Sequence, residues 1–503
     1  MRTHLVFAVL TIVLLVFLIS QTGSKTLVFD DVIEQARQLS KQDFERQKET
    51  ASELLKNADY AATRKIRMRD EAYVWREQGL PFQLGFFPTA GLHSRPVSIF
   101  SVSNDGARWL KPESSSFDYL DNVVPPEERH LVDYAGVRVM YPINERGRLD
   151  EVIALLGASY FRAVAKGQSW GISARGIALD PGGEDAEEFP DFTKFWFIEP
   201  TAASTDLRFY ALLDGPSLTG AYEFRVYPGP ETKVAVKAVL FARKDISILG
   251  IAAMTSMFWY GENTSNTFGN FRPEIHDSDG LQIKTAKGEW LWRPLAWSQQ
   301  TQWNVFEAPE TPSGFGLFQR DRDFEHYQDL ETHYHQRPSL WIEPGGDWGP
   351  GRVKLLQLPT DNEYMDNVVA FWEPKETFEA GESLEFDYTL VWFGENAGLP
   401  PLGRNIATRI DYQNEKYYRN VVLDFGGGEL SGLPADAPVK PIIWVSDNGA
   451  VKNPGVQKNS NDSTWRVNFV PTTDQSDLPI EMRCTLMLDG RPVSETWTYT
   501  WIP

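Results

Sequence analysis

The chain has 503 residues, and 69 acidic against 49 basic residues give it a net charge of −20. A chain this acidic has no general electrostatic attraction to nucleic acid, so nucleic acid is excluded as its partner. The single cysteine, Cys484, excludes an internal disulfide and a cysteine-ligated metal cluster. Hydrophobic residues make up 42% of the chain, which is enough for a large core and excludes a disordered protein.

The N-terminus has the pattern of an export signal. After Arg2, an apolar run extends from Leu5 to Ser20 with only Thr11 interrupting it, and small polar residues follow. This pattern predicts that residues 1–24 are a cleaved signal peptide, and the alternative is an uncleaved N-terminal anchor. Both interpretations export the rest of the chain, and a periplasmic location suits both.

The body of the chain is expected to be mainly β. Apolar spacing predicts one or two helices in residues 30–57 and a short helical turn in 70–79. Beyond residue 83, short apolar runs alternate with Gly, Pro, Asn and Asp, which is typical of antiparallel sandwiches. The predicted strands are 97–102, 137–141, 152–156, 192–198, 207–213, 221–226, 233–241, 354–357, 368–372, 384–392, 421–424, 442–445, 465–469, 481–488 and 495–501.

Glycines and prolines near residue 400 indicate a domain boundary. We expect a large β-sandwich domain over residues 25–396, a linker over 397–403 and an immunoglobulin-like sandwich over 404–503. Cys484 falls in one of the predicted strands of the last part, so a buried structural thiol is expected there.

Several kinds of chemistry find no support in the sequence. It has no GxSxG, no P-loop and no HExxH motif. His326, His333 and His335 lie close together, and on a strand the last two would share a face, but surface or hydrogen-bonding histidines are the favoured interpretation. No metal and no cofactor is therefore predicted.

Acidic clusters next to aromatic residues remain, and tryptophans are frequent between residues 290 and 372. Aromatic faces can pack against the C–H faces of sugars, and carboxylates and Arg–Asp pairs can bind hydroxyls. Glycoside hydrolysis needs only two carboxyl groups, one to protonate the leaving oxygen and one to activate water. The composition is therefore compatible with a carbohydrate-active protein, although composition alone does not select the two carboxyls.

Whole motifs are more specific than composition. The chain closely resembles the periplasmic glucan biosynthesis proteins of types G and D of Gram-negative bacteria. The motifs that carry the resemblance include LGASYFRAV (156–164), GISARGIALD (171–180), EEFPDFTKFWF (187–197), PEIHDSDGL (273–281), GFGLFQRDRDFEHYQD (314–329), RPSLWIEP (337–344) and DNVVAFW (366–372). The resemblance implies that the large sandwich is of the galactose-mutarotase-like kind and that the ligand is an osmoregulated glucan with a β-1,2-linked backbone.

The resemblance also implies roles for individual residues. Asp366 matches the general acid of an inverting β-1,2-glucanase or transglycosylase, and Glu363 is expected to hold or tune it. Asp277 matches the base, which acts through a proton relay, and Tyr334 is expected in that relay or in substrate binding. The expected substrate-binding residues beside them are Trp348, Trp372, Arg322 and Asp321.

Alternatives remain open. The short stretch between Arg404 and Asn420 and the lack of a twin-arginine signal place the chain nearer the G type, in which activity can be weak. A non-catalytic glucan-binding factor needed for backbone synthesis or branching, with a membrane glucan synthase as a partner, is therefore the second hypothesis, and a homodimer is possible. A sugar epimerase is a lower third, suggested only by fold analogy.

Overall fold

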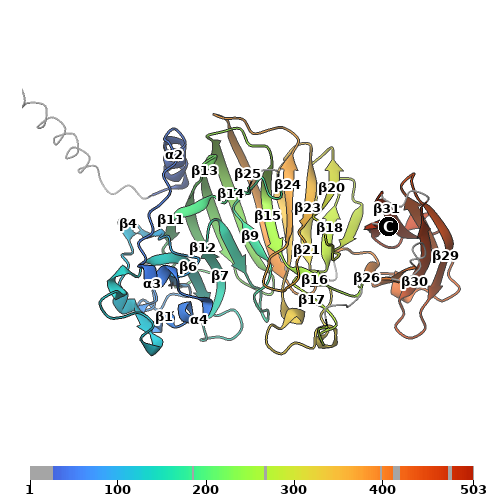
Figure 1. Cartoon of the computed structure of the whole chain (residues 1–503), viewed down its shortest axis with the longest axis horizontal. Helices are drawn as coiled ribbons and strands as arrows, with labels where there is room; N and C mark the ends of the chain where they lie inside the picture. Colours follow the sequence, from blue (N-terminus) through green and yellow to red (C-terminus); the bar gives the residue numbers. More distant parts are fainter. Residues whose placement is uncertain are drawn as a thin grey trace, which may run out of the picture.

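Two large sheets stacked face to face form most of the molecule, as the computed structural model shows (Figure 1). The structure describes residues 27–183, 186–264, 269–396, 399–411, 420–473 and 478–501. The predicted N-terminal signal or anchor, residues 1–24, lies outside these residues. The mainly-β, sandwich-like fold predicted from the sequence is confirmed.

The first sheet has ten strands in the order β2-β6-β7-β8-β9-β15-β24-β23-β20, with β10 paired to β15. The bounds are β2 (Gln83–Pro88), β6 (Tyr134–Tyr141), β7 (Asp150–Leu156), β8 (Tyr160–Ala163), β9 (Ser173–Arg175), β10 (Ala178–Leu179), β15 (Leu249–Ser256), β20 (Gln302–Ala308), β23 (Gly351–Gln357) and β24 (Val368–Pro374).

The second sheet has fifteen strands in the order β28-β31-β33-β19-β18-β21-β22-β25-β14-β13-β12-β11-β3-β4, with β32 paired to β31. The bounds are β3 (Ser98–Ser103), β4 (Gly106–Trp109), β11 (Asp191–Ile198), β12 (Leu207–Asp214), β13 (Leu218–Tyr227), β14 (Thr232–Ala242), β18 (Gly280–Lys284), β19 (Trp290–Pro294), β21 (Gly314–Phe318), β22 (Ser339–Gly345), β25 (Ser383–Phe393), β28 (Lys440–Val445), β31 (Ile480–Leu488), β32 (Arg491–Pro492) and β33 (Thr496–Trp501).

Alternating residues of both sheets fill the space between them. Phe161 of β8 packs edge-on against Phe224 of β13, with 5.3 Å between the ring centroids, and lies 6.1 Å from the ring of Trp392 in β25. Burying one such aromatic side chain contributes about 2 kcal/mol. Because strand residues alternate between faces, the neighbours Tyr160 and Arg162 point to the opposite, outer face of the ten-stranded sheet.

The C-terminal part is joined to the large sheet by hydrogen bonds. It contains a four-stranded sheet, β26 (Arg404–Ile410), β27 (Val421–Gly426), β30 (Trp465–Thr472) and β29 (Ala450–Lys458), packed on β28, β31 and β33 (Figure 1, dark red). Trp497 of β33 pairs in parallel with Trp292 of β19, so the large sheet continues into this part. Cys484 is fully buried in β31, as expected, and burial raises the pKa of its thiol to about 12. The domain boundaries themselves stay a prediction.

Short elements complete the fold. The helices are α2 (Phe29–Leu39), α3 (Glu53–Lys56) and α4 (Tyr60–Thr63), and the 3-10 turns are η1 (Asp70–Ala72), η2 (Ser114–Ser116), η3 (Leu120–Asn122), η4 (Arg129–Leu131), η5 (Phe324–His326), η6 (Tyr334–Gln336) and η7 (Leu430–Gly432). Two small ladders join β1 (Ile66–Met68) to β5 (Phe117–Tyr119), and β16 (Phe258–Tyr260) to β17 (Ile275–His276).

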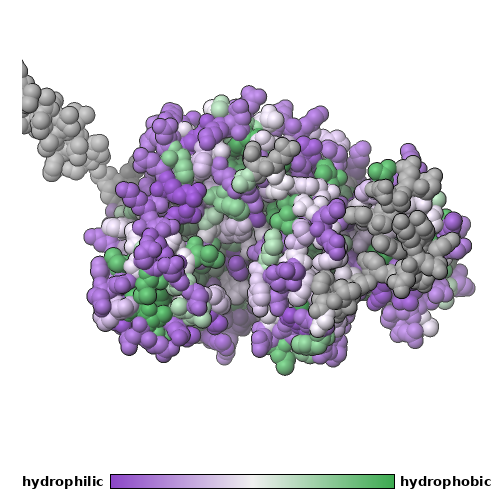
Figure 2. All heavy atoms as spheres, in the orientation of Figure 1, coloured by the Kyte–Doolittle hydropathy of each residue, from purple (hydrophilic) through white to green (hydrophobic). Residues whose placement is uncertain are grey.

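Helix α2 covers part of the outer face of the fifteen-stranded sheet. Its buried residues Val32 and Ala36 pack in one cluster with residues of β11 to β14 such as Trp196. Among the residues that the structure describes, no helix has the length and hydrophobicity needed to cross a bilayer. The visible surface is predominantly hydrophilic, with hydrophobic residues in separate small patches (Figure 2).

Candidate functional site

The short ladder between β16 and β17 brings two distant aspartates to one place. Phe258 of β16 pairs with His276 of β17, and Asp277 follows directly. The side chain of Asn367 accepts the Phe258 N–H at 2.9 Å and donates to the Phe258 carbonyl at 3.0 Å. Asp366 precedes Asn367, so this pair of hydrogen bonds holds Asp366 beside the strand pair that carries Asp277.

Asp277 is a buried carboxylate with a buried cationic partner. It is 5% exposed, its N–H donates to the carbonyl of Met257 at 2.8 Å, and the Arg337 guanidinium donates to its Oδ1. Burial raises the pKa of Asp277 above its ordinary value, Arg337 opposes this shift, and the negative charge of Asp366 adds to it.

Tyr334 links Asp277 to Glu363. The Arg337 guanidinium lies 4.4 Å from the centre of the Tyr334 ring, and the Tyr334 hydroxyl donates to Glu363 Oε2. Tyr334 is only 1% exposed, so its orientation is fixed by packing. The predicted residues Asp277, Tyr334 and Glu363 therefore lie in one continuous network.

Two arginine hydrogen bonds fix Glu363. Arg272 donates from its two terminal nitrogens to Glu363 at 2.8 and 3.0 Å and also to Asp329 at 2.7 Å. Burial acts to raise the pKa of Glu363, but the hydrogen bonds from Arg272 and Tyr334 outweigh it and hold the pKa below its ordinary value. Glu363 is thus an ionised carboxylate whose charge is matched mainly by Arg272.

Asp366 differs from the other members of this network because its side chain is exposed. Its negative charge acts on Asp277, on Arg337 and on the Tyr160 hydroxyl. Asp366 lies at the surface, two residues before the start of β24, and Val369 of that strand pairs with Thr255 of β15.

Arg322 holds the segment that carries the network. It donates to the carbonyls of Arg337 and Gly394, the second at 3.1 Å, and to Ser339 Oγ at 3.2 Å. Burial lowers the pKa of Arg322, and nearby carboxylates such as Asp279 oppose that shift. The terminal nitrogens of Arg322 thus hold acceptors of the protein, and its expected role in substrate binding stays a prediction.

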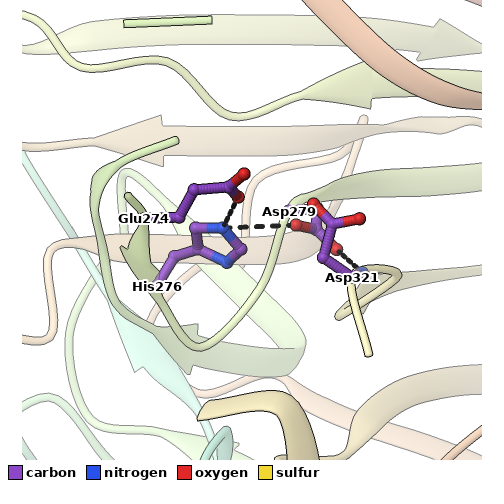
Figure 3. A group of neighbouring side chains, drawn as sticks. All are labelled: Glu274, His276, Asp279 and Asp321. Atoms are coloured by element: carbon purple, nitrogen blue, oxygen red, sulfur yellow. Dashed lines mark hydrogen bonds and ion pairs between the residues drawn. The ribbon is translucent and has the colours of Figure 1, made fainter. Parts of the chain in front are cut away.

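Asp321, the second residue expected to bind substrate, belongs to a separate cluster with Glu274, His276 and Asp279 (Figure 3). One ligand-type atom of each of the four residues lies within 4.8 Å of the others. His276 Nε2 is 2.9 Å from Glu274 and 3.4 Å from Asp279. Its other ring nitrogen, Nδ1, is 2.9 Å from Gln319 Oε1, and both contacts are buried.

Histidine charges balance this cluster. Burial alone would lower the pKa of His276, but Asp279 and Glu274 raise it to about 10. His326 lies 3.3 Å from Glu274 and from Asp321, and hydrogen bonds to these carboxylates raise its pKa to about 11. Oxygen and imidazole donors suit a divalent cation by type. Here two imidazolium groups face three carboxylates, and burial together with the charge of Asp279 raises the pKa of Asp321 to about 7. Each of these carboxylates already has a partner within the protein.

The three neighbouring histidines of the sequence do not share one face. His333 has a left-handed backbone, with φ 49°, and directly precedes the 3-10 turn η6, so the arrangement expected on a strand is not formed. The rings of His333 and His335 lie 5.9 Å apart, whereas His326 belongs to the ion-pair cluster.

The two tryptophans predicted to bind substrate lie elsewhere. Trp372 is 0% exposed in the main core, so its ring presents no face to a sugar, and that prediction is corrected. Trp348 packs against Trp372 and donates to the carbonyl of Asp387 at 3.2 Å. It precedes β23 at the end where Gly351 pairs with the last residue of β24. A strand of seven residues extends about 20 Å, so Trp348 is that far from Asp366 at the other end of β24.

Sequence reasoning missed three residues that build the network: Arg272, Arg337 and Asn367. All three lie in or beside motifs that already carried the resemblance. The sequence shows two arginines and an asparagine at these positions, but the groups that they bind lie far away along the chain. No local pattern could have paired them.

The fold and the network define a mainly-β protein of stacked sheets with a carboxylate-rich site at the end of the strands. The chain belongs to the family whose model is described as "Periplasmic glucan biosynthesis protein, MdoG", which matches residues 27–501. The resemblance inferred from the motifs is confirmed at this level.

Individual relatives include both types of the family. "Glucans biosynthesis protein G" of Ralstonia nicotianae is 40% identical over 96% of this chain and 98% of its own length. "Probable glucans biosynthesis protein D" of Shewanella oneidensis is 41% identical over 87% of this chain and 82% of its own. "Glucans biosynthesis protein D 1" of Ralstonia nicotianae is 39% identical, over 96% and 94%. Identity to the two types is similar, so the G-type assignment stays a prediction.

Proposed function

We propose that this protein acts in the periplasm on a β-1,2-linked glucan, as an inverting endo-glucanase or transglycosylase. Asp366 is the general acid and Asp277 the base, coupled to the attacking water through a relay. Family membership supports a role in periplasmic glucan biosynthesis, and the β-1,2 linkage and the reaction rest on the motifs at Asp366 and Asp277. A homodimer and a membrane glucan synthase as partner belong to the same hypothesis.

One observation carries the proposal: Asn367 holds Asp366 beside the strand pair that carries Asp277. A glycosidase of this kind needs two carboxyls on opposite sides of the bond that breaks. An exposed Asp366 and a buried Asp277 at one place provide two different environments for the two roles. Different environments are the usual way in which two carboxyls acquire acid and base functions.

In the proposed step, water attacks the anomeric carbon as the glycosidic C–O bond breaks. The leaving oxygen takes the proton of Asp366, and the water loses its proton towards Asp277. The raised pKa of Asp277 favours this role, since a base works best with a pKa near the working pH. In transglycosylation a sugar hydroxyl replaces the water, with the same proton movements.

Because Asp366 is exposed in the free protein, the bound substrate itself has to shield it from water. A carboxyl must be kept from bulk water to donate its proton efficiently, and a bound glucan would cover this side chain. Tyr334 and Glu363 lie next to the relay, because Arg337 contacts both Asp277 and the Tyr334 ring.

A non-catalytic glucan-binding factor is the second candidate. It is favoured by the exposure of Asp366 in the free protein and by the names of the relatives, which refer to biosynthesis. Such a factor would present the glucan backbone to other enzymes and would use the same surface.

The deciding experiment measures reducing ends released from linear β-1,2-glucan by the wild type and by Asp366→Asn. We expect release by the wild type, with the anomeric configuration of the product inverted in a time-resolved NMR spectrum, and strongly reduced release by the variant. Failure of the wild type at high protein concentration would exclude the hydrolase. Equal rates in both proteins would remove Asp366 from the mechanism.

A further inference from the structure

A group of aromatic and charged side chains on the outer face of the ten-stranded sheet has no assigned role. Tyr160 begins β8 and Arg175 ends β9, and the two residues pair across the strands. Phe161 and Ala174 belong to the core, so strand alternation sends Tyr160 and Arg175 to the outer face.

The three side chains of the group are held in a fixed geometry. The rings of Tyr160 and Phe189 are stacked, with 6.5 Å between centroids and 24° between planes. The Arg175 guanidinium lies 4.8 Å from the centre of the Tyr160 ring and 5.6 Å from that of Phe189. A cation near an aromatic face is stabilising, and more so where water is excluded.

Arg175 is a buried charge with fixed partners. Its side chain is 5% exposed, it donates to Thr255 Oγ1 at 2.7 Å, and it forms an ion pair with Glu187. Burying a charge is costly unless it is paired, and these partners hold the Arg175 guanidinium in one position on this face. Phe189, by contrast, is 44% exposed.

This group lies beside the proposed general acid. Arg175 donates to Thr255 of β15, Thr255 pairs with Val369 of β24, and Asp366 precedes the start of β24 by two residues. Burial is the main cause that raises the pKa of Tyr160, and the charges of Glu187 and Asp366 add to it against Arg175. Tyr160 also borders a surface hollow together with Gln47, His93, Arg95 and Asp191. An exposed ring beside a fixed cation, with a polar hollow bordered by Tyr160, matches what a sugar ring requires: an apolar face to pack on and partners for its hydroxyls.

We propose that Phe189, Tyr160 and Arg175 form a sugar-binding subsite that holds a pyranose unit of the glucan to one side of the bond that Asp366 acts on. The inference rests on the proposed function for the identity of the glucan, but not for the existence of the subsite. Phe189 provides the face for the sugar, and Arg175 fixes Tyr160 and Phe189 from below.

The test measures binding in the Asp366→Asn background, where the ligand is not consumed. Titration calorimetry with linear β-1,2-glucan compares this protein with the double variant that also carries Phe189→Ala. We expect the dissociation constant to rise about tenfold, since one exposed aromatic contact is lost. In the catalytic protein the same change should raise KM more than it lowers kcat, because the contact is made before and during the reaction.

Trp109→Ala is the matched control. Trp109 is 48% exposed, similar to Phe189, but lies on β4 at the edge of the other sheet. We expect it to leave the dissociation constant unchanged. Thermal unfolding of both variants verifies that they fold, which is expected because neither side chain is buried.

An unchanged dissociation constant in the folded Phe189→Ala protein would overturn the subsite. If the Asp366→Asn protein binds no β-1,2-glucan, the proposed substrate fails, and the titration is repeated with β-1,3- and β-1,4-linked glucans. If Phe189→Ala weakens the binding of the glucan that the Asp366→Asn protein recognises, the subsite is supported. If Phe189→Ala leaves that binding unchanged, or if none of the glucans binds, the subsite is overturned.

Discussion

Two polar networks start from the neighbouring residues His276 and Asp277 at the end of β17. The first is buried and paired within the protein, whereas the second reaches the surface. His276 faces the cluster of Glu274, Asp279 and Asp321, whose carboxylates are paired with His276 or His326. Asp277, the next residue, faces Arg337 and the open surface where Asp366 is exposed.

This difference indicates that the buried cluster has a structural role and that the network with Asp366 is the one available to a ligand. In the closed cluster every named carboxylate has a partner within the protein, so it can fix the loops after β17 and β21 but offers little to a ligand. In the open network the terminal member, Asp366, faces solvent. Substitutions in the first network should therefore affect stability, and substitutions in the second should affect activity.

The largest expected effect is on activity, from Asp366→Asn. Loss of a general acid costs about 10²- to 10⁴-fold in rate, whereas an exposed side chain contributes little to stability. Glucan hydrolysis and thermal unfolding, measured on the same preparation, test both parts. A large loss of stability would remove the distinction between the two networks.

Glu274→Gln should have the largest effect on stability. Removing one partner of a buried ion pair costs about 3 kcal/mol, because Glu274 is the carboxylate that His276 and His326 share. Burial alone would raise the pKa of Glu274, but hydrogen bonds from the two histidines lower it from 4.5 to about 2.

The lowered pKa of Glu274 sets how the stability difference between the wild type and Glu274→Gln depends on pH. A carboxyl with a lowered pKa in the fold stabilises the protein above pH 4.5 and loses this contribution as the pH falls towards 2. Urea unfolding at pH 7 and pH 3 should therefore show a larger gap between wild type and Glu274→Gln at pH 7. A gap that grows towards low pH would contradict the ion-pair assignment.

Tyr334→Phe tests the connection within the open network. The change removes the hydrogen bond to Glu363 but keeps the ring under Arg337, so stability should fall by about 1 kcal/mol. We expect activity to fall about tenfold, with a changed pH profile, if Tyr334 supports the relay. A variant that loses stability but keeps the wild-type pH profile would limit Tyr334 to packing.

Trp348→Ala should have the smallest effect. Trp348 packs at the end of β23 about 20 Å from Asp366, so the KM for glucan should stay unchanged. A raised KM would mean that the glucan also reaches the opposite end of β24, where Trp348 packs.

Local patterns were sufficient for much of the fold. Each strand predicted in the described residues, from 97–102 to 495–501, overlaps an observed strand, and Cys484 is buried in β31 as expected. These predictions succeed because strand alternation and turn residues are properties of a few consecutive positions. The motifs were also sufficient for the family, and they selected Asp277, Tyr334 and Glu363, which the fold brings into one network.

Only the tertiary structure decided which candidates share a site. Trp372 and Asp366 stand close in the sequence, yet the first is fully buried in the core and the second is exposed beside Asp277. Asn367, Arg337 and Arg272 acquire their roles from partners in distant segments. Burial and ion pairing depend on which strands become neighbours in the sheet, and that neighbourhood is a non-local property of the chain.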